Sequence, residues 1–151
     1  MLVLVLASGC GGGGGGGGGG EPVGCTFVPG QVTTSAGGSA GQSNYTLLLD
    51  EPGSSLYIYF NNINLTFVPR QTNGSGFTQV SSEIVQLGDI CLDEVSGWPG
   101  GTTAPVTAFL GATYMVRFER TPVGQSTTVH LAAFTVDAYS DGVVTYTWVG
   151  L

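Results

Sequence analysis

The sequence has very little positive charge. It contains no lysine, its three cationic side chains are Arg70, Arg117 and Arg120, and ten carboxylates give a formal net charge of −7. Proteins that bind nucleic acids displace counterions from phosphates with Lys and Arg, and clusters of the same residues attract anionic lipid headgroups. The composition therefore excludes nucleic-acid binding and electrostatic attraction to an anionic membrane surface.

Charged residues of either sign are scarce, and long apolar runs are lacking. Only 9% of the residues are charged, against about 25% in an ordinary soluble protein. Hydrophobic residues make up 42%, which is enough for a folded core. The surface is therefore expected to consist of Thr, Ser, Asn, Gln and Gly, as in many exported β proteins. The apolar run at residues 2–7 is much shorter than the roughly 20 residues of a membrane-spanning helix.

The N-terminal residues have the pattern of an export signal. Residues 2–7 (LVLVLA) are apolar and lead into Ser8-Gly9-Cys10, where small residues are typical of a cleavage site. The segment Ala7-Ser8-Gly9-Cys10 resembles the lipobox of bacterial lipoproteins, with Ala7 where Leu is commoner. The resemblance implies that residues 1–9 are the remnant of a signal peptide and that Cys10 becomes a lipidated N-terminus. Palmitate and further acyl chains there would give stable membrane anchoring. A signal peptide begins with a positively charged region, which is missing here, so we expect the true signal to be longer. An ordinary secretory signal with an incidental cysteine is the alternative.

A run of ten glycines, Gly11 to Gly20, follows directly. Such a segment is a flexible coil with a root-mean-square span of roughly 17 Å. It is not a phosphate-binding loop, because no strand precedes it and no Lys or Ser/Thr follows at the required spacing. We therefore expect residues 10–24 to be a tether and residues 25–151 to form one domain. The domain would stand off a bacterial membrane in the cell envelope, on the periplasmic or surface face of the outer membrane.

Two cysteines remain in the expected domain, Cys25 and Cys91. An even number of cysteines in an exported chain predicts a disulfide. A structural zinc site needs four ligands, and these two cysteines with the single histidine, His130, fall short of that number. We therefore expect a disulfide between Cys25 and Cys91, no metal site and no cofactor.

The domain shows the pattern of an all-β protein. Short runs of alternating apolar and polar residues recur between Gly, Pro and Asn, and no stretch has an apolar stripe of helical period. This pattern predicts a single antiparallel β-sandwich, or a partly closed barrel. The expected strands are residues 45–49, 56–60, 63–68, 77–87 (with a break), 90–92, 106–110, 113–120, 127–136 and 143–149.

One hairpin is predicted in detail. Asn61-Asn62 separates residues 56–60 from 63–68, and Asn tolerates the positive φ of a two-residue turn. That turn would pair Phe60 with Ile63, Ile58 with Leu65, and Leu56 with Phe67, all buried on one face. The opposite face would then place Tyr57 across from Thr66 and Tyr59 across from Asn64.

The C-terminal portion is expected to form two further hairpins. Within residues 113–120, alternation predicts that Tyr114, Val116 and Phe118 are buried and that Met115, Arg117 and Glu119 face outward. Asp141-Gly142 is a strong two-residue turn signal. In the strands on either side of that turn, large apolar residues occupy both odd and even positions. The pattern therefore does not determine which face of these strands is buried.

Aromatic side chains supply the candidate ligand-binding site. Tyr57 and Tyr59 share the polar face of the hairpin with Asn64 and Thr66, and Trp98 lies in a loop rich in Gly and Pro. Flat rings beside amides and hydroxyls suit a sugar or a peptide. Buried rings are the commoner case, however. The alternative is that the tyrosines meet a second sheet and that Trp98 closes one end of the core.

No catalytic constellation is evident. His130 lies within an expected strand, and the chain has no Gly-x-Ser-x-Gly motif, so a structural role is expected for this histidine. The closing pattern (TYMVRFE, VHLAAFTV, DGVVTYTW) is similar to the last strands of haem-binding lipoproteins of the HmuY type. This resemblance implies haem capture, which depends on paired axial ligands, and His130 with Met115 would be an unusual pair.

The expected function is that of a non-catalytic, lipid-anchored β module of the cell envelope for binding, adhesion or assembly, with a protein or glycan partner. The alternative is a lipoprotein that binds a soluble ligand, carbohydrate or haem. A small hydrolase is a more remote alternative.

Overall fold

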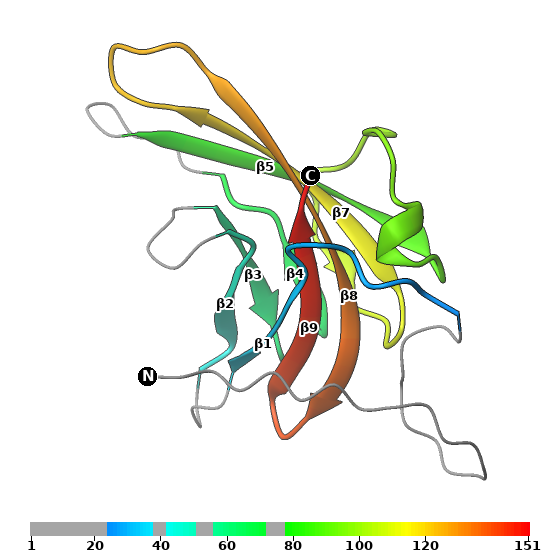
Figure 1. The fold of residues 1–151 in the computed structure, drawn as a ribbon. Helices are drawn as coiled ribbons and strands as arrows, with labels where there is room; N and C mark the ends of the chain where they lie inside the picture. Colours follow the sequence, from blue (N-terminus) through cyan, green and yellow to red (C-terminus); the bar gives the residue numbers. More distant parts are fainter. Residues whose placement is uncertain (1–23, 38–41, 51–55, 72–77) are drawn as a thin grey trace, which may run out of the picture.

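The computed structural model describes residues 24–37, 42–50, 56–71 and 78–151. The expected signal peptide, Cys10 and nearly all of the glycine tether lie outside the described residues. Within them, the chain forms two antiparallel β-sheets packed against each other (Figure 1). No helix among the described residues has the length and apolar character needed to cross a membrane.

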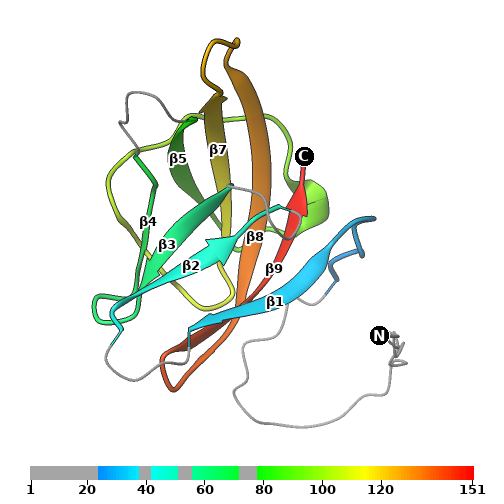
Figure 2. The same cartoon turned by 90° about the vertical axis from the view of Figure 1, so that its left-hand side faces the viewer.

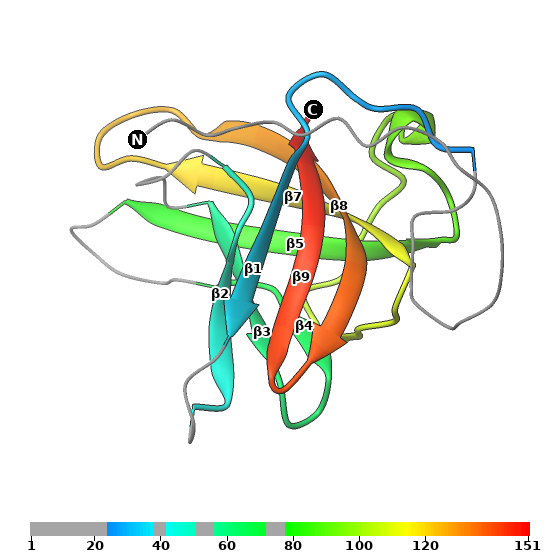
Figure 3. The ribbon, with the colours of Figure 1, turned by 60° about the horizontal axis from the view of Figure 1, so that its bottom comes forward.

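The larger sheet has five strands and the smaller has four. The order in the five-stranded sheet is β1 (Val32–Gly37), β9 (Val143–Gly150), β8 (Thr128–Ser140), β7 (Thr113–Thr121) and β5 (Gln79–Gly88). The order in the four-stranded sheet is β2 (Asn44–Leu48), β3 (Tyr57–Asn61), β4 (Thr66–Val68) and β6 (Val106–Thr107). Figures 2 and 3 show the two layers and the twist between them. The prediction of an all-β sandwich is confirmed, and the sheets do not close into a barrel.

The core is a cluster of aromatic rings between the sheets. The ring of Phe67 on β4 lies 4.9 Å from both Tyr114 and Phe134, and both contacts are edge-to-face. The buried hydroxyls have partners: Tyr114 Oη donates to the Thr107 carbonyl at 2.9 Å, and Tyr146 Oη donates to the Leu48 carbonyl at 3.0 Å. Burial raises the pKa of Tyr114, and it raises the pKa of Tyr146 to about 12. The rings therefore join the sheets through packing and through hydrogen bonds.

The detailed hairpin prediction is correct in its faces and wrong in its register. Phe60 pairs with Phe67, and the turn spans residues 62–65 where two residues were expected. The reason is local: Asn61 Oδ1 accepts hydrogen bonds from the backbone amides of Ile63 and Asn64, both at 3.0 Å, and thereby stabilises a wider turn. Ile63 is 74% exposed and Leu65 is 38% exposed, so these two predictions of burial are wrong. Leu56, Ile58, Phe60 and Phe67 are buried as predicted.

The five-stranded sheet is covered over part of its outer face as well. Met115 was expected to face outward and is fully buried instead. A second apolar cluster forms on this face, in which Ala133 and Val149 pack with Leu92, Val28 and Val95. A register shift between Val136 and Ala138 also moves the inward side chains of β8 by one position. Both features explain why the last two strands carry apolar residues at both parities.

The disulfide between Cys25 and Cys91 is confirmed, with Cα atoms 5.3 Å apart. Other boundaries differ from expectation. Residues 90–92 form no strand, and a 3₁₀ turn, η1 (Leu92–Glu94), follows Cys91. The strand expected at residues 106–110 ends at Thr107, and β5 is continuous from Gln79, with one register shift near its end. Residues 72–77, where that strand was expected to begin, lie outside the described residues.

Candidate functional site

Tyr57 and Tyr59 lie on the outer face of the four-stranded sheet, opposite the core. Both are half-buried, while their neighbours Ile58 and Phe60 point inward and are buried. Their ring centroids are 5.5 Å apart at an interplanar angle of 77°. The guanidinium carbon of Arg70 lies 4.3 Å from the centroid of the Tyr57 ring. A cation over an aromatic face is attracted by the ring quadrupole, so the outer face presents two rings and one positive charge. We call Tyr57, Tyr59 and Arg70 the tyrosine face.

The tyrosine hydroxyls interact with each other. A hydrogen bond with the Tyr57 side chain raises the pKa of Tyr59, and partial burial and the proximity of Tyr57 raise it further. The positive charge of Arg70 opposes this shift. The Tyr59 hydroxyl is therefore neutral at physiological pH. It can act as donor and acceptor for a hydroxylated ligand.

The other expected ligand residues are only partly gathered at this face. Thr66 is on β4, paired with Asn61, and shares the outer face with Tyr59 because its neighbour Phe67 points inward. Asn64 lies in the exposed turn. Trp98 belongs to another part of the molecule, the loop that forms a bridge from Thr102 to Ile84 on β5. A Cβ on Gly101 would lie 2.7 Å from the Trp98 ring, so glycine is what lets the indole pack against this loop.

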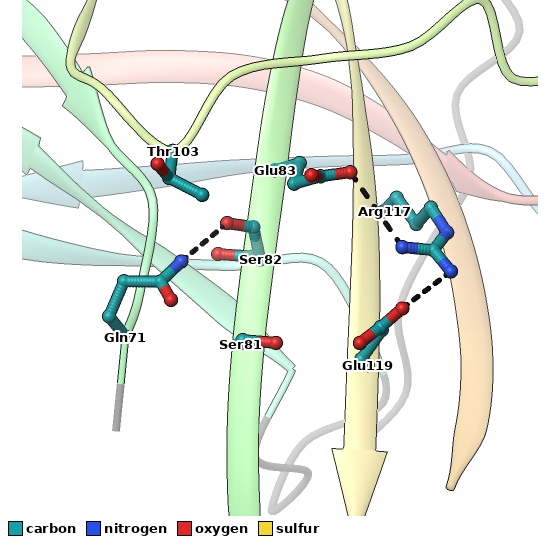
Figure 4. A pocket seen from close by; sticks show the side chains of 7 residues that line it. All are labelled: Gln71, Ser81, Ser82, Glu83, Thr103, Arg117 and Glu119. Atoms are coloured by element: carbon teal, nitrogen blue, oxygen red, sulfur yellow. Dashed lines mark hydrogen bonds and ion pairs between the residues drawn. The ribbon is translucent and has the colours of Figure 1, made fainter. Parts of the chain in front are cut away.

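A small polar pocket of about 90 Å³ lies beside β5 and β7. Figure 4 shows the side chains that line it. Arg117 is held there between two carboxylates, with 2.6 Å to Glu119 and 3.7 Å to Glu83. Because two negative charges face one positive charge, the pocket is not an anion site. The Gln71 side chain donates to the Ser82 carbonyl at 2.8 Å, which joins the preceding loop to β5. These residues stabilise the edge of the sheet, and surface pairs of this kind each contribute little.

His130 is exposed on β8, beside a cleft of about 210 Å³. Its Nε2 atom is 3.2 Å from Thr128 Oγ1. Asp50 lines the same cleft, and the described lining residues include no Ser, Thr or Cys that could act as a nucleophile. The hydroxyl that contacts His130 belongs to Thr128, which is not among the described lining residues of this cleft.

The ligand pair considered for haem is divided between the two faces of the five-stranded sheet. His130 pairs with Phe118, whose side chain points to the core, whereas Met115 pairs with Ala133 on the opposite, covered face. Side chains that point to opposite faces cannot hold one iron between them. Cys25, Cys91 and Asp93 also lie close together, but both sulfurs are joined in the disulfide and cannot ligate a metal.

An apolar pocket of about 250 Å³ opens at the end of the sandwich where β8 turns into β9. Its floor consists of Phe60, Val136 and Val144, which are buried core residues. Its remaining lining residues come from two loops and from the end of β8, and they are Leu65, Ala108, Leu110 and Tyr139. None of the described lining residues carries a charge. The sequence pattern does not reveal this pocket, because Leu65 and Leu110 were expected to lie within strands.

Comparison with protein-family models, with curated proteins and with solved structures finds no match to this chain.

Proposed function

We propose that the chain is a non-catalytic binding module of the bacterial cell envelope, anchored by lipid on Cys10, and that the tyrosine face engages a protein or glycan partner. The observation that carries the proposal is the outward orientation of Tyr57 and Tyr59 together with Arg70 over the Tyr57 ring. Rings that only fill a core would point inward between the sheets. These rings lie on the opposite side of β3 from the core.

The position of the tyrosines on the outer face of a sheet favours a module for binding, adhesion or assembly over a receptor that encloses its ligand. Ligand pockets normally enclose most of the ligand, whereas the outer face of β2, β3 and β4 is the surface of an open sheet. Aromatic rings with hydroxyls and one guanidinium offer stacking and hydrogen bonds to a polymer that extends across the sheet. A carbohydrate is the second candidate, because the two rings and Thr66 are of the kind that sugar C–H and O–H groups contact.

The chemistry of the other polar sites supports a non-catalytic role. The charge of Arg117 is neutralised by Glu83 and Glu119. Among the described residues, the lining of the cleft beside His130 has no hydroxyl or thiol, and the hydroxyl that contacts His130, on Thr128, lies outside that lining. We therefore propose that the β domain binds a partner and does not catalyse a reaction.

The test measures how strongly the purified chain is retained on immobilised neutral and acidic oligosaccharides and on immobilised cell-envelope material. Tyr59→Ala should lower retention by about tenfold, because a stacked aromatic contact of roughly 1–1.5 kcal/mol is lost. Phe27→Ala is the matched control, because it removes an aromatic ring that is 70% exposed in the segment before β1. Equal retention of the wild type and the Tyr59 variant on every surface would refute the role of the tyrosine face.

A further inference from the structure

The apolar pocket at the end of the sandwich is separate from the tyrosine face. Its floor includes Phe60, which points to the inner side of β3, whereas Tyr57 and Tyr59 point to the outer side. We propose that this pocket is a binding site for a neutral aromatic ring system of about two fused rings. This site goes beyond the proposed function, because it needs neither the anchor nor the tyrosine face.

The size of the pocket fits such a ligand. An apolar cavity of about 150 Å³ in another protein stays dry and takes up benzene. The pocket here measures about 250 Å³, so it has room for a larger ring system. The floor residues Val136 and Val144 are buried with 2% and 1% exposure, so the ligand would reach the edge of the core.

The walls of the pocket favour a ring over a hydrocarbon chain. Phe60 and Tyr139 meet with their centroids 5.8 Å apart and their planes at 68°. A third ring placed against this pair can adopt the edge-to-face or offset geometries that aromatic quadrupoles prefer. The Tyr139 hydroxyl donates to the Asn62 carbonyl at 3.4 Å, which orients the ring at the edge of the pocket. Since the part of the lining that the structure describes has no charged residue, it offers no ionic partner to a carboxylate, a phosphate or an amine.

The conformation of Leu65 is the second observation. Its φ is +50°, in the left-handed region that bulky residues rarely adopt and that Gly and Asn adopt easily. The Leu65 side chain nevertheless lies at the mouth of the pocket, 38% exposed. Its backbone is fixed there because the Leu65 carbonyl accepts a hydrogen bond from the Ala108 amide at 2.8 Å. A strained position that presents an apolar side chain to a pocket indicates a role for that side chain in binding.

Leu110, which lines the pocket, is 54% exposed, and the preceding residue, Phe109, is 52% exposed. Contiguous apolar surface of this kind marks interaction sites in soluble proteins. In the free protein it is open to water. A ring in the pocket would cover Leu110, Leu65 and the exposed edge of Tyr139 together.

The probe is indole, titrated against the whole chain with methyl groups observed by NMR. Saturable shifts are expected at Ala108, Val136 and Val144, with a dissociation constant on the order of 1 mM or lower for a ligand of this size. The absence of saturable shifts at these methyls, or saturable shifts elsewhere only, would overturn the proposal.

Two variants in the turn after Asn61 distinguish specific binding of indole in the pocket from nonspecific binding to exposed apolar side chains. Leu65→Asn should weaken indole binding by about fivefold or more, and its melting temperature should not fall, because Asn relieves the left-handed strain. Ile63→Asn, in the same turn but not lining the pocket, should bind indole as the wild type does. Equal weakening in both variants would overturn the assignment. Ala108→Leu, which fills the pocket, should abolish binding, and if that variant does not fold the Leu65 comparison decides.

Two further measurements, each made on the wild-type chain and on Leu110→Asp, test for other occupants of the pocket. Sedimentation with neutral phosphatidylcholine vesicles that requires Leu110 would show that the apolar surface docks on lipid, which would overturn the proposal. Dimerisation that Leu110→Asp abolishes would show that a second copy covers the pocket and would overturn it as well. A monomer that ignores vesicles and binds indole supports it. Because Tyr59→Ala leaves this pocket intact, its effect on glycan retention reports on the proposed function alone.

Discussion

Replacement of Phe67 by Ala tests the packing of the two sheets most severely. Phe67 is fully buried and its ring has edge-to-face contacts at 4.9 Å with Tyr114 on β7 and with Phe134 on β8. Phe→Ala in a core costs roughly 3–5 kcal/mol, and each aromatic pair adds about 0.5–1.5 kcal/mol beyond the area buried. Because two such pairs are lost, we expect the upper part of that range, about 4.5 kcal/mol.

The assay is chemical and thermal unfolding followed by circular dichroism. The unfolding entropy is about 2.1 cal/mol/K per residue, so for a domain of about 127 residues the loss corresponds to a fall in Tm of roughly 17 °C. Phe27→Ala is the control, since that ring is 70% exposed and its loss should change the free energy of unfolding by about 0.5 kcal/mol or less. A loss below about 2 kcal/mol for Phe67→Ala would refute the reasoning, because the rings would then not join the sheets.

Three further outcomes are expected. Removal of the Cys25–Cys91 disulfide, which spans 66 residues, should cost up to about 4 kcal/mol and lower Tm without loss of the β circular dichroism spectrum; an unfolded product would contradict this. Burial raises the pKa of Tyr146 from 10.0 in the free side chain to about 12 in the folded protein. As the pH rises from 10 to 12, this tyrosine therefore ionises in the unfolded state first, and its contribution to the free energy of unfolding, which is fully present below pH 10, should be lost. Tyr146→Phe should flatten that fall in unfolding titrations, and an unchanged alkaline profile would refute the assignment. Gly37→Ala should be much more destabilising than Gly30→Ala in the same assay, because only at Gly37 would a Cβ collide with the β8–β9 turn; equal losses would contradict the close approach.

Much of the fold follows from residue alternation, and the exceptions have physical causes. The alternation in β3 reflects a sheet with one buried face, so the pattern predicts that strand well. In β7 it predicts the inward side chains, and Met115 departs from it because the outer face is covered there. β1 was missed because its sequence, VTTSAG, lacks large alternating apolar residues. It is an edge strand whose hydroxyls bind across the sheet, with 2.7 Å from Thr33 to Thr147 and 2.9 Å from Ser35 to Thr145. A ladder of this kind leaves no hydrophobic signal in the sequence.

The candidate site was only partly accessible from sequence. The orientation of Tyr57 and Tyr59 follows from period-two alternation and survives the error in register, because the observed pairing moves the partner strand by an even number of positions. The position of Arg70 beyond the end of β4 carries no local signal of its contact with Tyr57. The apolar pocket depends on the wide turn after Asn61 and on the early end of β6, and both are set by side-chain and tertiary hydrogen bonds.

The most direct test of the proposed function is lipidation of Cys10. The chain is expressed in a bacterial host behind the leader of a known lipoprotein, joined so that Ala7-Ser8-Gly9-Cys10 is kept, and labelled palmitate is supplied during growth. The account predicts that the wild type incorporates palmitate and sediments with the outer membrane, whereas Cys10→Ser incorporates none and is recovered in the soluble fraction. Equal membrane association of the two proteins, or a wild type without palmitate, would contradict the account.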